Sequence, residues 1–370
     1  MAQVRALGLI SGGLDSAIAV KLMLDQGIDV TVLHFKTAFS TDVFKHPEYG
    51  RITRSEALAR YFNVPLKLVM LEEEYYRFIK HPPHDYGSAL NPCMDCHTFF
   101  LKKAKAIMEE EGFDFVFTGE VMGQRPMSQL KDQLQYVERH SGMTGKVLRP
   151  LSAKLLTPTE AEEQGLVDRE ALLDISGRSR RVQMELAESW DLQFYSAPGG
   201  GCLLTEKDFG KRLEDLFDAR HPGLPNTAEI ELLKQGRQFR LADGRKFIVG
   251  RTHMENGVLK NHAAKAGLWA AEPMGFPGPA IIIADPIAPG AGEPRPECIA
   301  TAGALCMLYG KHNADAEPGA QSLRLYNPAA PRKGILYPLP DEIPWTKADL
   351  DPFRVDHPDK KIRRKGWPLD

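Results

Sequence analysis

The hexapeptide SGGLDS, residues 11–16, follows the short apolar run RALGLI and leads directly into a helix-like segment. Gly12 and Gly13 permit a tight turn and a close approach of the backbone to a ligand. The amides at the start of the following helix point toward any anion placed there. The stretch therefore predicts a phosphate-binding loop between a first strand and a first helix. The plainer alternative is a glycine turn in which Ser11 caps the helix, and it explains less of this context.

Strand-like and helix-like segments alternate from this loop to about residue 118. The pattern predicts strands at 28–35, 66–71 and 113–119, and helices at 17–27, 53–64 and 99–112. Thr53 and Glu56 have the spacing of a capping box, which supports a helix start there. Strands separated by helices of this length indicate an α/β fold with a doubly wound parallel sheet. In such sheets, ligands bind beyond the carboxyl ends of the strands.

The pattern changes after about residue 150. We predict a catalytic domain at 1–175, a helical extension with a linker at 176–227, and a C-terminal α+β domain at 228–370. The linker is the segment ARHPGLPN, which contains two prolines and a glycine. Short strands around a glycine turn follow it, and they predict the separate α+β domain.

Composition limits the class of protein. Apolar residues make up 43% and charged residues 26% of the chain, and no apolar run is long enough to predict a membrane span. The first residues lack the apolar core of a secretory signal, so we expect a cytoplasmic protein with reduced thiols. A net charge of −2 gives no overall attraction to nucleic acid, so any phosphate binding must come from local patches.

SGGLDS in its strand–loop–helix context resembles the hallmark of the PP-loop ATP pyrophosphatases. Members of that superfamily split ATP between the α and β phosphates and adenylate an oxygen atom, which a nucleophile then displaces as AMP. The resemblance implies ATP and Mg²⁺ as cofactors. It assigns the nucleotide to Ser11, Gly12, Gly13, Asp15 and Ser16, with Asp15 as a catalytic Mg²⁺ partner or as a helix cap.

Two further segments, FTGEVMGQ and LRPL, resemble the catalytic domain of the tRNA 4-thiouridine synthases. By that resemblance, Gly119, Gln124 and Ser128 lie near the nucleotide or the target uridine, and His34 lies near the adenosine end of ATP. The residues themselves say only that these positions follow predicted strands, where a ligand is expected.

Five cysteines are present, and their spacing leaves three kinds of chemistry open. Cys93 and Cys96 form a CxxC pair, and Cys202 follows three glycines that give its backbone freedom. A structural zinc site needs a fourth ligand, for which His97 is one candidate. A redox pair needs no third cysteine. A three-cysteine [4Fe–4S] cluster leaves one iron open to bind hydrosulfide. Cys298 and Cys306 lie in an apolar run, which predicts buried core thiols.

A PP-loop domain with a CxxC and a later single cysteine resembles the iron–sulfur-dependent tRNA thiolation enzymes. The resemblance implies that Cys93, Cys96 and Cys202 are both the cluster ligands and the catalytic thiols. The sulfur donor would be sulfide or a persulfide carrier. Related thiouridylases use two cysteines without a cluster, so that scheme stays open, as does Zn²⁺.

Residues 243–285 resemble the RNA-binding module of the NFACT proteins. The matching positions are Val249, Gly250, Arg251, Asn256, Leu259, Leu268, Trp269, Pro277 and Gly278, whereas Gly267 and Ala270 depart from the usual pattern. Arg251 could pair with phosphate, and Trp269 could either stack on a base or pack in the core. Further basic residues for RNA are Arg178, Arg180 and Arg181, together with the tail at 360–365.

These features predict an ATP-dependent tRNA sulfurtransferase that adenylates a uridine oxygen and replaces it with sulfur. The competing prediction is a PP-loop ligase or amidotransferase that acts on a small carboxylate and carries structural zinc. The sequence does not decide which uridine is modified, whether O4 or O2 is replaced, or whether the protein forms a homodimer.

Overall fold

The structure is a computed structural model that describes residues 3–126, 128–192, 201–284, 293–317, 319–330 and 334–367. The chain divides into two compact units. Unit 1 comprises residues 1–71 and 82–203, and unit 2 comprises residues 72–81 and 204–370. The three-part division expected from the sequence stays a prediction. None of the helices in the described residues combines the length and apolar character required to cross a bilayer.

Unit 1 contains a parallel sheet of five strands. The strands are β1 (Arg5–Leu9), β2 (Asp29–Thr37), β5 (Leu66–Leu71), β6 (Phe115–Thr118) and β7 (Val147–Leu148). Their order is β5-β2-β1-β6-β7, and all four pairings are parallel. The direction in which successive strands are added therefore reverses between β1 and β6, and a ligand crevice is expected at their carboxyl ends. The predicted α/β fold class is confirmed.

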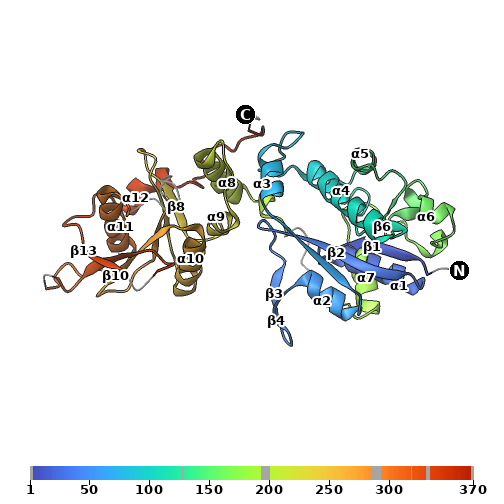
Figure 1. The fold of residues 1–370 in the computed structure, drawn as a ribbon, viewed down its shortest axis with the longest axis horizontal. Helices are drawn as coiled ribbons and strands as arrows, with labels where there is room; N and C mark the ends of the chain where they lie inside the picture. The colour runs from blue at the N-terminus through green and yellow to red at the C-terminus, as the bar shows by residue number, and fades with distance from the viewer. Residues whose placement is uncertain are drawn as a thin grey trace. The chain divides into compact units, whose positions relative to one another are not determined.

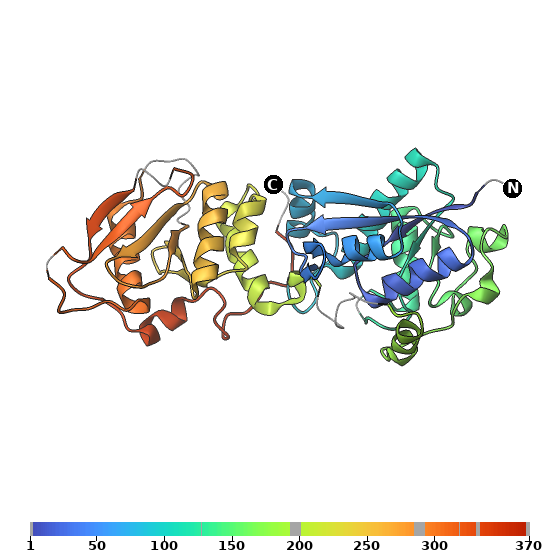
Figure 2. The same cartoon turned by 90° about the horizontal axis from the view of Figure 1, so that it is seen from below.

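Helices cover both faces of this sheet (Figures 1 and 2). Helices α1 (Leu14–Asp25) and α7 (Arg181–Ser189) pack together on one face. Helices α4 (Cys93–Glu111) and α5 (Lys131–Ser141) pack together on the other. Ala6 and Leu7 of β1 and the apolar side chains of β6 are almost fully buried between these layers, as expected for strands covered on both faces.

Helix α2 (Arg54–Tyr61) begins where the capping box predicts. The Thr53 side chain accepts a hydrogen bond from the Glu56 amide at 3.1 Å, and the Glu56 carboxylate accepts one from the Thr53 amide at 2.7 Å. The sequence did not predict the hairpin of β3 (Val43–His46) and β4 (Gly50–Thr53) that precedes it. This hairpin forms a two-stranded sheet of its own.

Unit 2 is built on a six-stranded sheet with the order β13-β12-β10-β11-β9-β8, and all its pairings are antiparallel. The strands are β8 (Arg237–Arg240), β9 (Lys246–Val249), β10 (Trp269–Met274), β11 (Ile281–Ile283), β12 (Ser322–Tyr326) and β13 (Ile335–Pro338). This is the α+β character that the sequence predicts.

Two apolar clusters lie against the sheet of unit 2. One gathers around α11 (Pro296–Tyr309) and includes Cys298 and Cys306, so the prediction of two core thiols is confirmed. The other gathers around α9 (Thr227–Leu232) and α10 (His253–Ala266). The described part of unit 2 also contains α3 (Glu73–Lys80), α8 (Lys207–Arg220) and α12 (Lys347–Leu350).

Candidate functional site

The predicted phosphate loop joins the end of β1 to the start of α1. Gly12 is buried and has a φ of +72°, a conformation that side chains rarely adopt. A Cβ atom at Gly12 would lie 2.6 Å from the Cβ of Arg54, so the loop packs directly against the first turn of α2. Ser16 Oγ accepts a hydrogen bond from the Ser11 amide at 3.3 Å and closes the loop.

Asp15 lies in the first turn of α1, beside the loop that follows β6. Gln124 Nε2 donates a hydrogen bond to Asp15 Oδ2 at 3.3 Å, so the structure brings these two predicted site residues together. The other carboxylate oxygen, Oδ1, is buried and has no hydrogen-bond partner among the described residues. An unpartnered buried carboxylate oxygen next to a phosphate loop suits a Mg²⁺ ion.

Gly119 begins the TGE-x-x-GQ loop at the end of β6. A Cβ atom there would lie 2.5 Å from the amide nitrogen of Ser16, so only glycine fits against the first turn of α1. Ser128, in the same loop, is buried. The segment expected near the nucleotide therefore packs against the phosphate loop itself.

A buried charge network joins this loop to two other segments. Glu120 accepts hydrogen bonds from His97 Nδ1 at 2.7 Å and from Arg149 Nε at 2.9 Å, and Arg149 also pairs with Glu138. Burial alone would raise the pKa of Glu120. The positive charge of Arg149 and the hydrogen bond from His97 outweigh this effect of burial, so the pKa of Glu120 falls to about 2.

Glu120 and Arg149 were not among the predicted site residues, although they lie inside the segments TGE and RPL. Their ion pair could have been predicted, because an acid and a base that follow two strands of one sheet become buried there, and buried charges require a partner of opposite charge.

His34 lies within β2, three residues before the end of the strand at which it was expected, and is almost fully buried. Its Nδ1 lies 3.0 Å from the carbonyl oxygen of Ile10, and its Nε2 lies 3.0 Å from Oδ2 of Asp42. Nε2 and the Asp42 carboxylate are close but not aligned as a hydrogen bond, so His34 links the phosphate loop to the start of the β3–β4 hairpin through Nδ1 and through proximity to Asp42. This contact suits a residue that positions the loop.

The CxxC pair occupies the first turn of α4, six residues earlier than the predicted helix start. Cys93 is partly buried and Cys96 is buried. The side-chain amide of Asn91 donates a hydrogen bond to the sulfur of Cys93 at 3.3 Å. Because α4 leads into β6, its first turn lies at the carboxyl edge of the sheet, on the same edge as the phosphate loop. His97 is four residues after Cys93 and thus shares its helix face.

Cys202 lies in unit 1, beside the segment that follows β2. It forms a β-bridge with Ser40, and the Leu203 amide donates to the carbonyl of Phe39 at 2.9 Å. The third thiol is thus also at the carboxyl edge. Within the described ranges, however, no three His, Cys, Asp or Glu side chains are arranged to hold a metal ion. The three thiols do not form a ready ligand set for a cluster or for zinc in this arrangement, and the glycine-rich stretch up to Gly200 lies outside the described residues.

The predicted RNA-binding arginines of unit 1 begin next to the site. Ser176 forms a bridge with Met122, and the Gly177 amide donates to the Met122 carbonyl at 2.8 Å. The exposed residues Arg178 and Arg181 follow directly, whereas Arg180 is partly buried. The basic segment therefore starts beside the loop that carries Gln124.

In unit 2, the NFACT-like motif residues have largely structural positions. Asn256 Oδ1 accepts a hydrogen bond from the Ala280 amide at 3.1 Å, and it occupies the space that a Cβ atom at Gly250 would need. Arg251 is exposed, and its guanidinium donates to the Gly236 carbonyl at 2.8 Å. Trp269 is partly buried and packs against the core cluster around α11. In the tail, Arg363 lies near Glu214 and Asp218 of α8.

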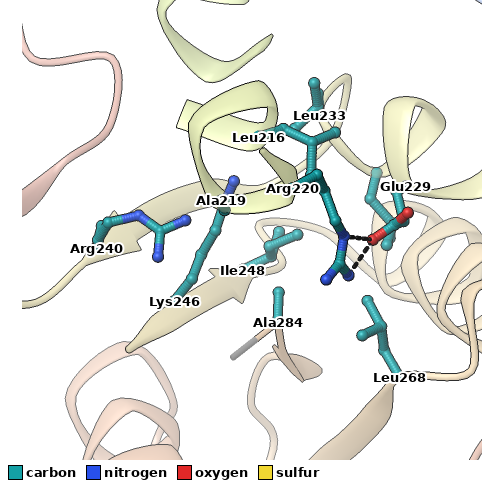
Figure 3. Close-up of a pocket in the computed structure, with 11 residues that line it drawn as sticks. Leu216, Ala219, Arg220, Glu229, Leu233, Arg240, Lys246, Ile248, Leu268 and Ala284 are labelled. Atoms are coloured by element: carbon teal, nitrogen blue, oxygen red, sulfur yellow. Dashed lines mark hydrogen bonds and ion pairs between the residues drawn. The ribbon is translucent and has the colours of Figure 1, made fainter. Parts of the chain in front are cut away.

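A pocket in unit 2 lies between α8, α9 and the sheet (Figure 3). Three cationic side chains line it, but each has a carboxylate partner. Arg220 pairs with Glu229, while Arg240 and Lys246 both pair with Asp215. Burial would raise the pKa of Asp215, and these two cations lower it strongly instead. The pocket therefore offers an anion no unpaired positive charge.

The chain matches two family models. Residues 1–154 match the family described as thiamine biosynthesis protein (ThiI). Residues 236–323 match the NFACT protein RNA binding domain. The fold, the phosphate loop and these two matches define a PP-loop nucleotide-binding domain followed by an RNA-binding domain. More particularly, the two matches support the predicted resemblance to tRNA thiouridine synthases of the PP-loop type with a C-terminal NFACT-like domain, and the ThiI match covers less than half of the chain.

Curated relatives carry the name tRNA-specific 2-thiouridylase MnmA. The protein from Fervidobacterium nodosum is 25% identical over 284 residues, which cover 68% of this chain and 74% of the relative. The protein from Petrotoga mobilis is 32% identical over 133 residues, or 32% of this chain and 36% of the relative. The chain thus aligns with only about a third of the second relative's length.

Among solved structures, a 4-thiouridine synthetase–RNA complex with bound ATP is 21% identical. The superposition covers 57% of this chain and 50% of the synthetase chain, with a TM-score of 0.32. NMN synthetase from Francisella tularensis is 14% identical, covers 54% of this chain and 90% of its own, and has a TM-score of 0.24.

Proposed function

We propose that this protein is an ATP-dependent tRNA sulfurtransferase that converts a uridine into a thiouridine. One observation carries the proposal: the phosphate loop, the TGE loop and the cysteine-bearing first turn of α4 meet at one edge of the sheet. Gly119 packs against Ser16, and Glu120 is hydrogen-bonded to His97 of α4. The matches to the ThiI family and to thiouridylases support the same activity.

In the first step, the loop at 11–16 holds the phosphates of ATP through its amides and the start of α1. Asp15, kept in place by Gln124, presents its unpartnered oxygen to Mg²⁺, which neutralises phosphate charge when bound. The uridine carbonyl oxygen attacks the α-phosphorus, the α–β bond breaks, and pyrophosphate leaves. Adenylation is needed because a uracil oxygen is a poor leaving group and AMP is a good one.

In the second step, a sulfur nucleophile adds to the activated carbon. Its proton is lost, the carbon–oxygen bond breaks, AMP leaves, and a carbon–sulfur double bond remains. Hydrosulfide adds to the carbon directly.

With a persulfide carrier, the Cys93 thiolate takes the outer sulfur and the carrier leaves as its thiolate. The Cys93 persulfide then adds to the carbon, and a second thiol, Cys96 or Cys202, breaks the sulfur–sulfur bond to form a disulfide, which an external thiol reduces. Asn91 donates a hydrogen bond to the sulfur of Cys93, which lies at the start of α4 and so suits this role.

The cluster remains a prediction about Cys93, Cys96 and Cys202. A bound cluster would supply an open iron that binds hydrosulfide. In the described arrangement, these three thiols do not converge on a common point where such a cluster could bind. Anaerobic purification followed by iron, sulfide and zinc analysis tests the prediction, with Cys202→Ala as the comparison. Stoichiometric iron and sulfide in the wild type, with less of both in Cys202→Ala, would support the cluster. Stoichiometric zinc without iron would refute it.

The tRNA is held, in this proposal, by Arg178 and Arg181 in unit 1 and by Arg251 in unit 2, all of them exposed. Binding through phosphates predicts an affinity that falls as salt rises. A homodimer and a cytoplasmic location remain predictions.

Nucleoside analysis of tRNA from a deletion strain tests the function. The loss of one thiolated nucleoside, restored by the wild-type chain and not by Asp15→Asn, is the expected result. Unchanged tRNA, together with ATP-dependent conversion of a small carboxylate by the purified protein, would favour the ligase instead.

A further inference from the structure

The β3–β4 hairpin of unit 1 has no part in the steps above. Its strands pair in the register Val43↔Thr53, Phe44↔Ile52, Lys45↔Arg51 and His46↔Gly50. It is separate from the five-stranded sheet and extends away from it (Figure 1). An isolated two-stranded hairpin is only marginally stable, so other contacts must stabilise this one.

Lys45 and Arg51 lie directly opposite each other on this hairpin, and both are exposed. Like charges at opposite positions of paired strands destabilise the pairing. The ion pairs found in the described part of the chain include neither residue. Asp42, just before the hairpin, pairs with His34, and Glu56, just after it, closes the capping box. Proteins commonly tolerate such a local loss of stability at functional sites. Two adjacent, exposed cations without an acidic partner among the described residues suit a site that binds an anion.

A third basic side chain fixes the tip of the hairpin. The guanidinium of Arg60, from α2, lies 4.7 Å from the centre of the Tyr49 ring. The ring of His46 also stacks on the Tyr49 ring, with 4.7 Å between the ring centres. The turn that connects Lys45 to Arg51 is therefore held by aromatic packing, and the two charges are presented on an ordered support.

Both ends of the hairpin are tied to the phosphate loop. At the first end, Asp42 contacts His34, whose ring also contacts the Ile10 carbonyl. At the second end, Arg54 follows β4 directly and packs against Gly12. The base of the hairpin that carries Lys45 and Arg51 is thus fixed to the segment that forms the phosphate loop.

From these contacts, we propose that the β3–β4 hairpin binds backbone phosphates of the tRNA substrate and holds the target next to the ATP site. This inference rests on the proposed function. RNA is the polyanion whose reacting base must reach the phosphate loop, which is where the hairpin is anchored, and its regularly spaced phosphates suit a pair of exposed cations.

The test compares tRNA binding by the full chain and by the double variant Lys45→Glu/Arg51→Glu, using fluorescence anisotropy over a range of salt concentrations. A matched control, Lys102→Glu/Arg139→Glu, makes the same change of net charge at exposed positions on α4 and α5. These helices cover the sheet face opposite α1 (Figure 1). We expect the hairpin variant to bind roughly tenfold or more weakly, with a slope of log affinity against log salt reduced by about two. ATP affinity should not change.

Equal tRNA affinity and salt slope in the hairpin variant and the wild type would overturn the inference and leave the proposed function standing. An equal loss in both double variants would also overturn it, because net charge alone would then explain binding. If Lys45→Glu/Arg51→Glu fails to fold, the milder double variant Lys45→Gln/Arg51→Gln replaces it. This variant should show a smaller loss of tRNA affinity. If the wild type binds no tRNA, the proposed function fails as well.

Discussion

Arg149 donates a hydrogen bond from Nε to Oε2 of Glu120 at 2.9 Å, and both side chains are buried. The two residues follow neighbouring parallel strands, β7 and β6, so their pairing joins the RPL segment to the TGE loop. Because Glu120 also holds His97 of α4, this pair connects the nucleotide side of the site with the cysteine side.

Replacing Glu120 with Gln should destabilise unit 1 strongly. The substitution leaves the guanidinium of Arg149 buried without its main partner, and breaking a buried pair from one side costs about 3–5 kcal/mol. Urea denaturation measures the loss in the free energy of unfolding. Glu110→Gln, on the exposed surface of α4, is the control and should change it by less than about 0.5 kcal/mol. Similar values for the two variants would contradict the assigned role.

The same carboxylate predicts a pH dependence of stability. Its pKa is lowered from 4.5 to about 2 in the folded state. The ionised form therefore favours the fold, its contribution is complete above pH 4.5, and it is lost as the pH falls toward 2. A shift of this size corresponds to about 3 kcal/mol. Urea denaturation at a pH above 4.5 and at a pH between 2 and 4.5 measures the free energy of unfolding. It should fall at the lower pH in the wild type and fall less in Glu120→Gln. Equal losses would show that Glu120 is not responsible.

Gly119→Ala should impair ATP binding more than it impairs folding. The added Cβ would lie 2.5 Å from the Ser16 amide, so the first turn of α1 must move. Overpacking of this kind costs about 1–3 kcal/mol, and the displaced atoms belong to the phosphate loop. Titration with ATP should show a weaker affinity, while tRNA binding through unit 2 persists. Unchanged ATP affinity would place the nucleotide elsewhere.

Gly250→Ala should destabilise unit 2, because Asn256 Oδ1 occupies the space of the new methyl group and would lose its bond to the Ala280 amide. Thermal unfolding of the full chain measures the effect. Gly257→Ala is the matched control: it lies in α10 with open space around it, so it should raise stability by up to about 1 kcal/mol. If both variants behave alike, the Gly250–Asn256 contact has no structural role.

Local features of the fold were predictable from sequence, whereas pairings between distant segments were not. The strand–SGGLDS–helix unit and the Thr53/Glu56 capping box depend on neighbouring residues, and the structure has both. The β3–β4 hairpin was missed because its strands are four residues each and too short to show a clear alternation. The turn around Pro47 and Gly50 was its only signal.

The candidate site shows the same division. The SGGLDS motif locates the phosphate loop, but the Glu120–Arg149 pair spans 29 residues, and the bridge between Ser40 and Cys202 spans still more of the chain. Contacts of this kind depend on the strand order of the sheet, which propensity does not encode. The start of α4 at Cys93 was also missed, because the apolar pattern becomes clear only from Phe99 onward.

The most direct test of the account is an assay with purified protein, undermodified tRNA, ATP, Mg²⁺ and sulfide, in which AMP and thiolated nucleosides are measured together. The account predicts that AMP and thiouridine form in equal amounts, that both require tRNA, and that Asp15→Asn abolishes both. AMP formation without any thiolated nucleoside, at the same rate with and without tRNA, would contradict it.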